Sequence, residues 1–146
     1  MEEIIEKLRL KTEVKKGENY ILANLSREVT NGPMQGWVCG HFYPKESIFH
    51  RHDVEICVKV LPVGKVEDLH YHLCSFEFLL VLSGKVEYEI DGDFHVLSPG
   101  TFYMLNPGNT ERIVKVYEET TIIAVRLPSI PKNKIFVEKE KSEQKK

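Results

Sequence analysis

Two histidines and a glutamate lie close together in the middle of the chain: His70, His72 and Glu77. Successive side chains of a strand point to opposite faces, so His70 and His72, two residues apart, present both imidazoles on one face. Glu77 begins an apolar run through residue 82 that is typical of a buried strand. If the two strands are neighbours, Glu77 reaches the histidines. Two imidazoles with a carboxylate are a common ligand set for non-haem iron, manganese, nickel or zinc.

Other reactive side chains have competing interpretations. Taken singly, a histidine on a strand is most often a structural residue, so the alternative for His70 and His72 is an interior or surface pair without a metal. Cys74 lies between His72 and Glu77. It could be an extra soft ligand or a nucleophile, but we favour a structural role as a small apolar residue at a strand end.

A second histidine pair, His50 and His52, flanks Arg51 in a polar segment after Pro44. This context favours a solvated loop. The alternatives are a second metal site, or a loop at the rim of a pocket that contacts substrate. His95 lies beside charged residues and is expected to be exposed.

The elements that must position these residues are short strands. Residues 54–61 alternate, with valines and isoleucine on one face and Glu55, Cys57 and Lys59 on the other, which indicates a half-buried strand. Further strands are predicted at residues 20–25, 35–43, 78–82, 85–90, 94–97, 101–105, 111–117 and 120–127. Gly84 is predicted to turn the chain, and turn signals recur every eight to twelve residues, as in an all-β sandwich or barrel. Residues 2–10 show the apolar stripe of a short amphipathic N-terminal helix.

The composition places bounds on the class of protein. The 146 residues suit one domain, and 42% hydrophobic with 29% charged residues is ordinary for a soluble protein. A net charge of -2 favours neither nucleic acid nor an acidic membrane as partner. No apolar run suits a membrane span, and the N-terminus is too charged for a signal peptide. Three cysteines without a Cys-x-x-Cys pair suit reduced thiols, so we expect a cytoplasmic protein.

The spacing around the histidines resembles the first motif of the cupin superfamily, which reads Gly, five residues, His-x-His, four residues, Glu, six residues, Gly. Its five anchors are matched by Gly64, His70, His72, Glu77 and Gly84. The second motif is matched at Gly100 and Gly108. Asn106 replaces its proline, and Glu111 stands in place of its final histidine.

The resemblance implies a fold and a ligand set. The fold is a double-stranded β-helix, or jelly roll, which forms the barrel at 35–130. The residue pattern outside the resemblance predicts an N-terminal helix and lead-in strand at 1–34 and a charged tail at 131–146, where residues 135–137 dock as a last strand. The metal ligands are His70, His72, Glu77 and, as a carboxylate in place of an imidazole, Glu111. Two histidines with two glutamates suit manganese or iron(II). The alternative for Glu111 is a surface glutamate beside Arg112.

Cupins include isomerases, epimerases, decarboxylases and dioxygenases, so the resemblance does not choose a reaction. It implies an enzyme of isomerase, epimerase or dioxygenase type that acts on a small oxygen-rich metabolite. The alternative is a non-catalytic small-molecule-binding or sensor protein. Candidate general bases are Glu111 and Tyr103, and no catalytic residue is assigned. Outward apolar residues such as Leu80 and Val114 favour a homodimer.

Overall fold

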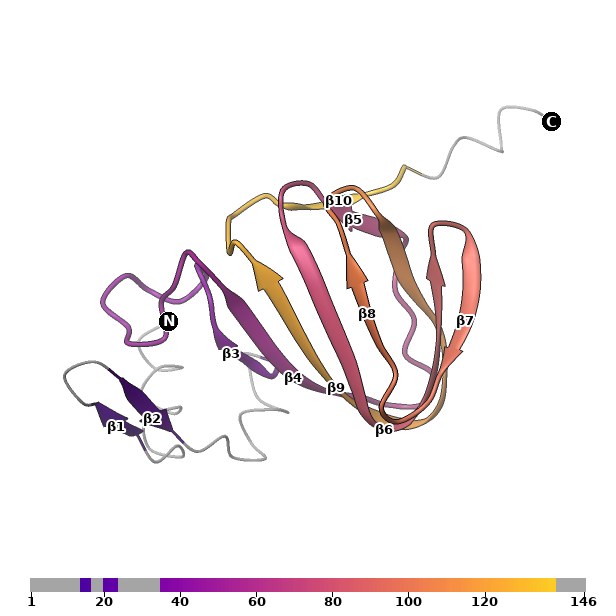
Figure 1. Cartoon of the computed structure of the whole chain (residues 1–146), viewed down its shortest axis with the longest axis horizontal. Helices are drawn as coiled ribbons and strands as arrows, with labels where there is room; N and C mark the ends of the chain where they lie inside the picture. Colours follow the sequence, from indigo (N-terminus) through magenta and orange to yellow (C-terminus); the bar gives the residue numbers. More distant parts are fainter. Residues whose placement is uncertain (1–13, 17–19, 24–34, 139–146) are drawn as a thin grey trace.

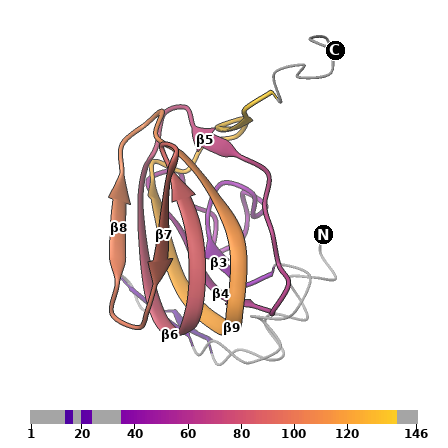
Figure 2. The ribbon, with the colours of Figure 1, turned by 90° about the vertical axis from the view of Figure 1, so that its right-hand side faces the viewer.

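The computed structural model describes residues 14–16, 20–23 and 35–138, and these form strands, turns and loops without a helix. The helix predicted at 2–10 lies outside these residues. Strands β1 (Val14–Lys16) and β2 (Ile21–Ala23) pair with each other. The other strands form one curled sheet of eight strands (Figures 1 and 2). The predicted all-β fold is therefore confirmed. In the described part of the chain, no helix has the length and apolarity needed to cross a membrane.

Two long strands organise the curled sheet. They are β6 (Phe76–Ile90) and β9 (Thr110–Leu127), which run antiparallel to each other along most of their lengths. The shorter strands are β3 (Trp37–Cys39), β4 (Glu55–Leu61), β5 (His70–His72), β7 (Asp93–Leu97), β8 (Phe102–Leu105) and β10 (Lys134–Phe136). The first half of β6 pairs with β8 and its second half with β7. The start of β9 pairs with β5, and its end pairs with β4. Each long strand therefore contributes to both layers of the jelly roll.

The long strands bend where they pass from one layer to the other. The pairing of β6 with β9 shifts register between Val81 and Val86. Gly84 lies at this bend with a φ of +91°, and a Cβ there would collide with the backbone of Glu119. Only glycine suits such a conformation and so close an approach. The prediction of a turn that ends the strand at Gly84 is thus wrong, because β6 bends and continues to Ile90. Likewise, the strands predicted at 111–117 and 120–127 are one strand, β9.

The interior lies between the two layers. Its apolar core consists of Cys57, Leu61, Leu79, Val81, Val86, Tyr88, Leu97, Ile113, Val116, Ile122 and Ala124. The predicted alternation of β4 is confirmed, but its mixed polar face points inward: Glu55, Cys57 and Leu61 are buried, whereas Val58 and Val60 are half-buried. The interior is therefore lined in part by charged side chains.

The chain's last described strand, β10, pairs with β5 and confirms the strand expected near residues 135–137. It also fixes one edge of the short strand that carries His70 and His72. The division into segments 1–34, 35–130 and 131–146 stays a prediction.

Candidate metal centre

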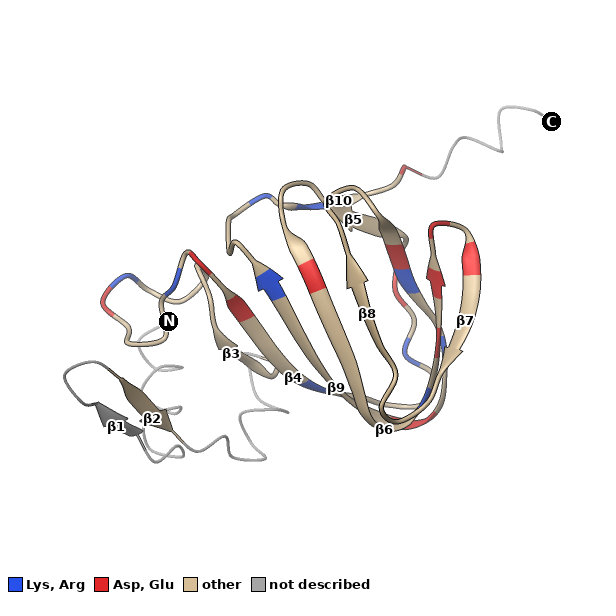
Figure 3. Ribbon diagram, in the orientation of Figure 1, with Lys and Arg blue, Asp and Glu red and all other residues tan. Residues whose placement is uncertain are grey.

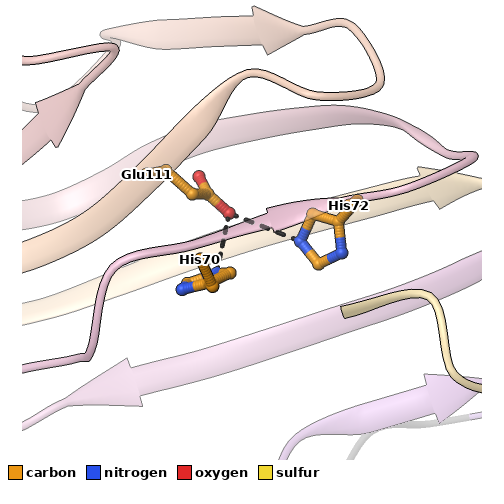
Figure 4. Close-up of side chains that lie close together, drawn as sticks. All are labelled: His70, His72 and Glu111. Atoms are coloured by element: carbon orange, nitrogen blue, oxygen red, sulfur yellow. Dashed lines mark ion pairs between the residues drawn. The ribbon is translucent and has the colours of Figure 1, made fainter. Parts of the chain in front are cut away.

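Strand β5 carries both histidines toward the interior. His70 and His72 are buried, while Tyr71 between them is partly exposed, as alternation along a strand requires. β5 lies between β10 and the start of β9, and the register places His70 opposite Glu111. The two imidazoles and the carboxylate therefore meet from neighbouring strands (Figure 4).

Glu111 contacts both imidazoles. Its Oε1 lies 3.3 Å from Nε2 of His70 and 3.5 Å from Nε2 of His72. The ligand atoms of the three residues all lie within 4.8 Å of one another. The alternative of a surface glutamate is wrong, because Glu111 is only 3% exposed and Arg112 pairs instead with Glu89. One ion could contact all three groups at this spacing.

Each histidine has a ring nitrogen free to act as a ligand. Nδ1 of His70 lies 2.8 Å from the carbonyl oxygen of Asp68, which can only accept, so Nδ1 carries the proton and Nε2 keeps its lone pair. Nε2 of His72 is buried and makes no hydrogen bond with any described residue, although Oε2 of Glu77 lies 2.9 Å away. A buried polar atom without a partner is costly, so this nitrogen suits a bound ion.

Glu77 is shared between His72 and a buried arginine. Besides its contact with His72, its Oε2 accepts a hydrogen bond from Nε of Arg126 at 3.3 Å. Nη1 of Arg126 donates to Oε2 of Glu55 at 3.1 Å. The register aligns Glu55, Arg126 and Glu77 side by side on β4, β9 and β6, where Figure 3 shows charged residues on three adjacent strands. Glu77 does not belong to the converging group of three, and its ligation stays a prediction.

The charges in the interior do not balance by themselves. Glu55, Glu77 and Glu111 are buried carboxylates, and Arg126 is the cation that pairs with two of them. With neutral imidazoles and every carboxyl ionised, these four residues have an excess of two negative charges, and Lys59 and Glu67, which also line the cavity, add one charge of each sign. Burying uncompensated charge costs several kcal/mol per ion. A divalent cation would cancel the excess, and nitrogen with carboxylate oxygen suits manganese, iron, nickel or zinc. The donors and the charge therefore both fit a metal.

The ionisable groups differ in how firmly they hold protons. Burial and the nearby charge of Glu111 raise the pKa of Glu77. Burial also acts on Glu111, but its contacts with His70, His72, Glu77 and Tyr103 outweigh that effect and hold its pKa well below the usual range. Burial lowers the pKa of His72, yet Glu111 and Glu77 leave it above its ordinary value. The carboxyl of Glu111 therefore gives up its proton more readily than that of Glu77.

A cavity of about 40 Å³ adjoins the cluster. Its lining includes His70, Glu77, Glu111, Tyr103, Lys59 and Arg126. Five of the lining residues are partly exposed: Trp37, Lys59, Glu67, Tyr103 and Arg126. Of the candidate ligands, His70, Glu77 and Glu111 thus line a cavity whose other lining residues are both charged and apolar.

The remaining sequence candidates lie elsewhere. Cys74 is exposed in the turn between β5 and β6, and its thiol is not in the converging group. His50 and His52 lie in a loop, as predicted, with their Nε2 atoms 3.0 Å apart and neither residue lining the cavity. His95 is exposed, as predicted.

Sequence reasoning missed three charged residues of this interior: Glu55, Lys59 and Arg126. For Glu55 and Lys59 the signal was present, since both lie on the mixed face of an alternating strand. Arg126 is flanked by Val125 and Leu127, and a single charge in an apolar strand is a weak signal of a buried ion pair.

The family model described as "Cupin domain" matches residues 57–123, which span β4 to most of β9 and include all four predicted ligands. The chain belongs to the cupin superfamily. No protein of curated function matches it.

Several solved structures share the fold. An uncharacterised conserved protein with a double-stranded β-helix domain from Klebsiella pneumoniae has 20% identity over 66% of this chain and 90% of its own, with a TM-score of 0.55. A protein from Planctomyces limnophilus has 24% identity over 68% and 79%, with a TM-score of 0.52. KdgF from Halomonas sp. has 22% identity over 56% and 74%, with a TM-score of 0.52. At these identities the likeness shows the fold.

Proposed function

We propose that this cupin binds one divalent transition metal through His70, His72 and Glu111, with Glu77 as fourth ligand, and is an enzyme acting on a small oxygen-rich metabolite. The observation that supports metal binding best is the buried Nε2 of His72, which has no hydrogen-bond partner in the described chain and lies in a set with excess negative charge. The cavity that His70, Glu77 and Glu111 line supports a small-molecule substrate.

A bound divalent ion would act as a Lewis acid toward substrate oxygens. If the ion were iron, it could instead activate molecular oxygen. The chain's own residues hold the donors and place protons. The hydroxyl of Tyr103 donates to Oε2 of Glu111, which leaves Oε1 directed at the two histidines. Burial raises the pKa of Tyr103 well above its usual range, so Tyr103 stays a proton donor at neutral pH. Tyr103 holds its proton and Glu111 is a proposed metal ligand, so neither of these two candidate general bases is favoured. The catalytic residues stay unassigned.

An isomerase, an epimerase and a dioxygenase all need a metal with coordination positions open to substrate. The alternative function, a non-catalytic binding or sensor protein, needs no exchangeable water on the metal. The mixed polar lining of the cavity favours the enzyme, because Lys59, Glu67 and Arg126 bring charged groups to a site that water can reach.

Water-proton relaxation of the Mn²⁺-loaded protein tests this proposal. We expect the bound ion to enhance relaxation, because it keeps exchangeable water, and sugars or oxo acids that bind the cavity should reduce the enhancement. The His70→Ala/His72→Ala variant is the control for loosely held Mn²⁺. A stoichiometrically bound ion without any enhancement would contradict the enzyme and favour the binding protein.

The proposal further includes that the protein forms a homodimer and is located in the cytoplasm. The outer face of β6 and β8 is apolar, since Phe78 and Leu80 pair with Met104 and Phe102, and the latter two are 60% and 56% exposed. Exposed apolar patches of this kind mark interfaces. We expect sedimentation at micromolar concentration to show a dimer, and Phe102→Lys to weaken it. A native chain that sediments as a monomer would contradict the dimer.

A further inference from the structure

Lys59 is a charged side chain on the inner face of β4. Its neighbours on that face, Cys57 and Leu61, are buried, and all three line the cavity that His70 and Glu111 also line. Lys59 therefore borders the same cavity as the candidate ligands His70 and Glu111. Neither the metal ligands nor the core requires a lysine at this position.

The partners of the two cavity cations differ. Arg126 pairs with both Glu55 and Glu77. Among the residues that the structure describes, no carboxylate lies within 4 Å of the Lys59 ammonium, and no hydrogen bond to it occurs. Glu67 also lines the cavity. It makes no ion pair with Lys59, and its charge acts on the pKa of Lys59 from a longer distance. Burial lowers the pKa of Lys59.

We propose that Lys59 is an anion-binding residue and that the ligand of this cavity is a small carboxylic acid, whose carboxylate pairs with the Lys59 ammonium. This inference rests on the proposed function and narrows its substrate class. Since none of the described carboxylates lies close to it, this partly buried ammonium gains a charge-assisted hydrogen bond when such a ligand binds. A neutral sugar offers no group that would compensate this charge.

The size of the cavity favours a short acid. A water needs about 10–15 Å³ of cavity measured in this way, so about 40 Å³ holds roughly three waters. Three waters occupy about 90 Å³ of liquid, which is on the order of a two- or three-carbon acid. A hexose is larger than this cavity. We therefore choose pyruvate as the probe and its methyl ester as the neutral analogue of the same shape.

Calorimetric titration of the metal-loaded protein with pyruvate and with methyl pyruvate tests the proposal. We expect pyruvate to bind, and the ester to bind at least 10-fold more weakly. Lys59→Met should weaken pyruvate binding roughly 10- to 100-fold, the range of a charge-assisted hydrogen bond, while Lys59→Arg keeps part of the affinity. Lys45→Met, at an exposed lysine outside the cavity, should bind pyruvate as the native chain does.

The metal content and the melting temperature of every variant are measured alongside. Metal loading and the fold should be unchanged in Lys59→Met, so a loss of pyruvate affinity is assigned to the ammonium. Equal binding of acid and ester, unchanged pyruvate affinity in Lys59→Met, or no pyruvate binding at millimolar concentration would overturn the carboxylate assignment while leaving metal binding intact. If the native chain takes up no metal yet binds pyruvate in a Lys59-dependent way, the anion site is supported and the proposed function is contradicted.

Discussion

The hydroxyl of Tyr103, on β8, donates a hydrogen bond to Oε2 of Glu111, on β9. The other carboxylate oxygen, Oε1, is the one that contacts His70 and His72. Tyr103 therefore orients the carboxylate toward the histidines from a strand that carries no candidate ligand. Groups that orient a ligand in this way commonly affect metal affinity as strongly as some ligands do.

Replacing Tyr103 with Phe should weaken metal binding roughly 10- to 100-fold, because Glu111 loses the donor that fixes its orientation. The ring of Tyr103 packs edge-on against Tyr88 with centroids 5.6 Å apart, and Phe preserves that contact. Competitive chelator titration with Zn²⁺ measures the affinity. Tyr117→Phe, which removes an exposed hydrogen bond to Glu87, is the control. Equal affinities in both variants would show that Tyr103 does not orient the ligand.

Replacing Glu111 with Gln should weaken the binding of manganese, iron and zinc roughly 10- to 100-fold or more, because one anionic ligand is lost. Glu111→His should fold and bind nickel or zinc better, since it restores a third imidazole. Calorimetry with each metal measures both effects. Unchanged affinities in Glu111→Gln would remove Glu111 from the metal site.

Replacing Arg126 with Met should destabilise the metal-free protein by about 3–5 kcal/mol, because Glu55 and Glu77 then lose their buried cation. Urea unfolding measures the change in the free energy of unfolding. Adding Glu55→Gln should recover part of the loss, since it removes one unpaired carboxylate. A loss below about 1 kcal/mol would indicate a solvent-screened pair instead.

Alkaline pH should destabilise the fold through Cys57. Burial raises the pKa of its thiol from 9.0 to about 11. The unfolded chain therefore loses this proton first, so the stabilisation is complete below pH 9 and disappears as the pH rises to about 11. Two pKa units correspond to about 2–3 kcal/mol. Urea unfolding from pH 8 to pH 11 should show this decline, and Cys57→Ala should reduce its slope while Cys74→Ala, at an exposed thiol, leaves it unchanged. Identical slopes in all three proteins would contradict the assignment to Cys57.

Strand periodicity and motif spacing were sufficient to predict that His70 and His72 share a face and that Glu111 lies near them. Their geometry follows from local rules, because residues two apart on a strand point the same way. The alternation on β4 likewise showed which residues share a face. It could not show which face is inside, because that depends on whether the interior is apolar or contains a polar site.

The ion pairs of Arg126 could not be predicted in the same way. Arg126 and Glu55 are 71 residues apart, and Arg126 and Glu77 are 49 apart. They meet through the register of β4, β9 and β6, which depends on where each strand bends and shifts. Pairings set by such irregularities leave little signal in a single sequence.

Metal analysis of purified protein tests the central claim most directly. We expect the native chain, after exposure to manganese, iron, nickel and zinc and subsequent desalting, to retain one transition metal ion per chain. The folded His70→Ala/His72→Ala variant should retain none, and His50→Ala/His52→Ala, at the exposed histidine pair, should retain the native amount. One ion per chain in the His70→Ala/His72→Ala variant, or no ion in the native protein, would contradict the metal centre.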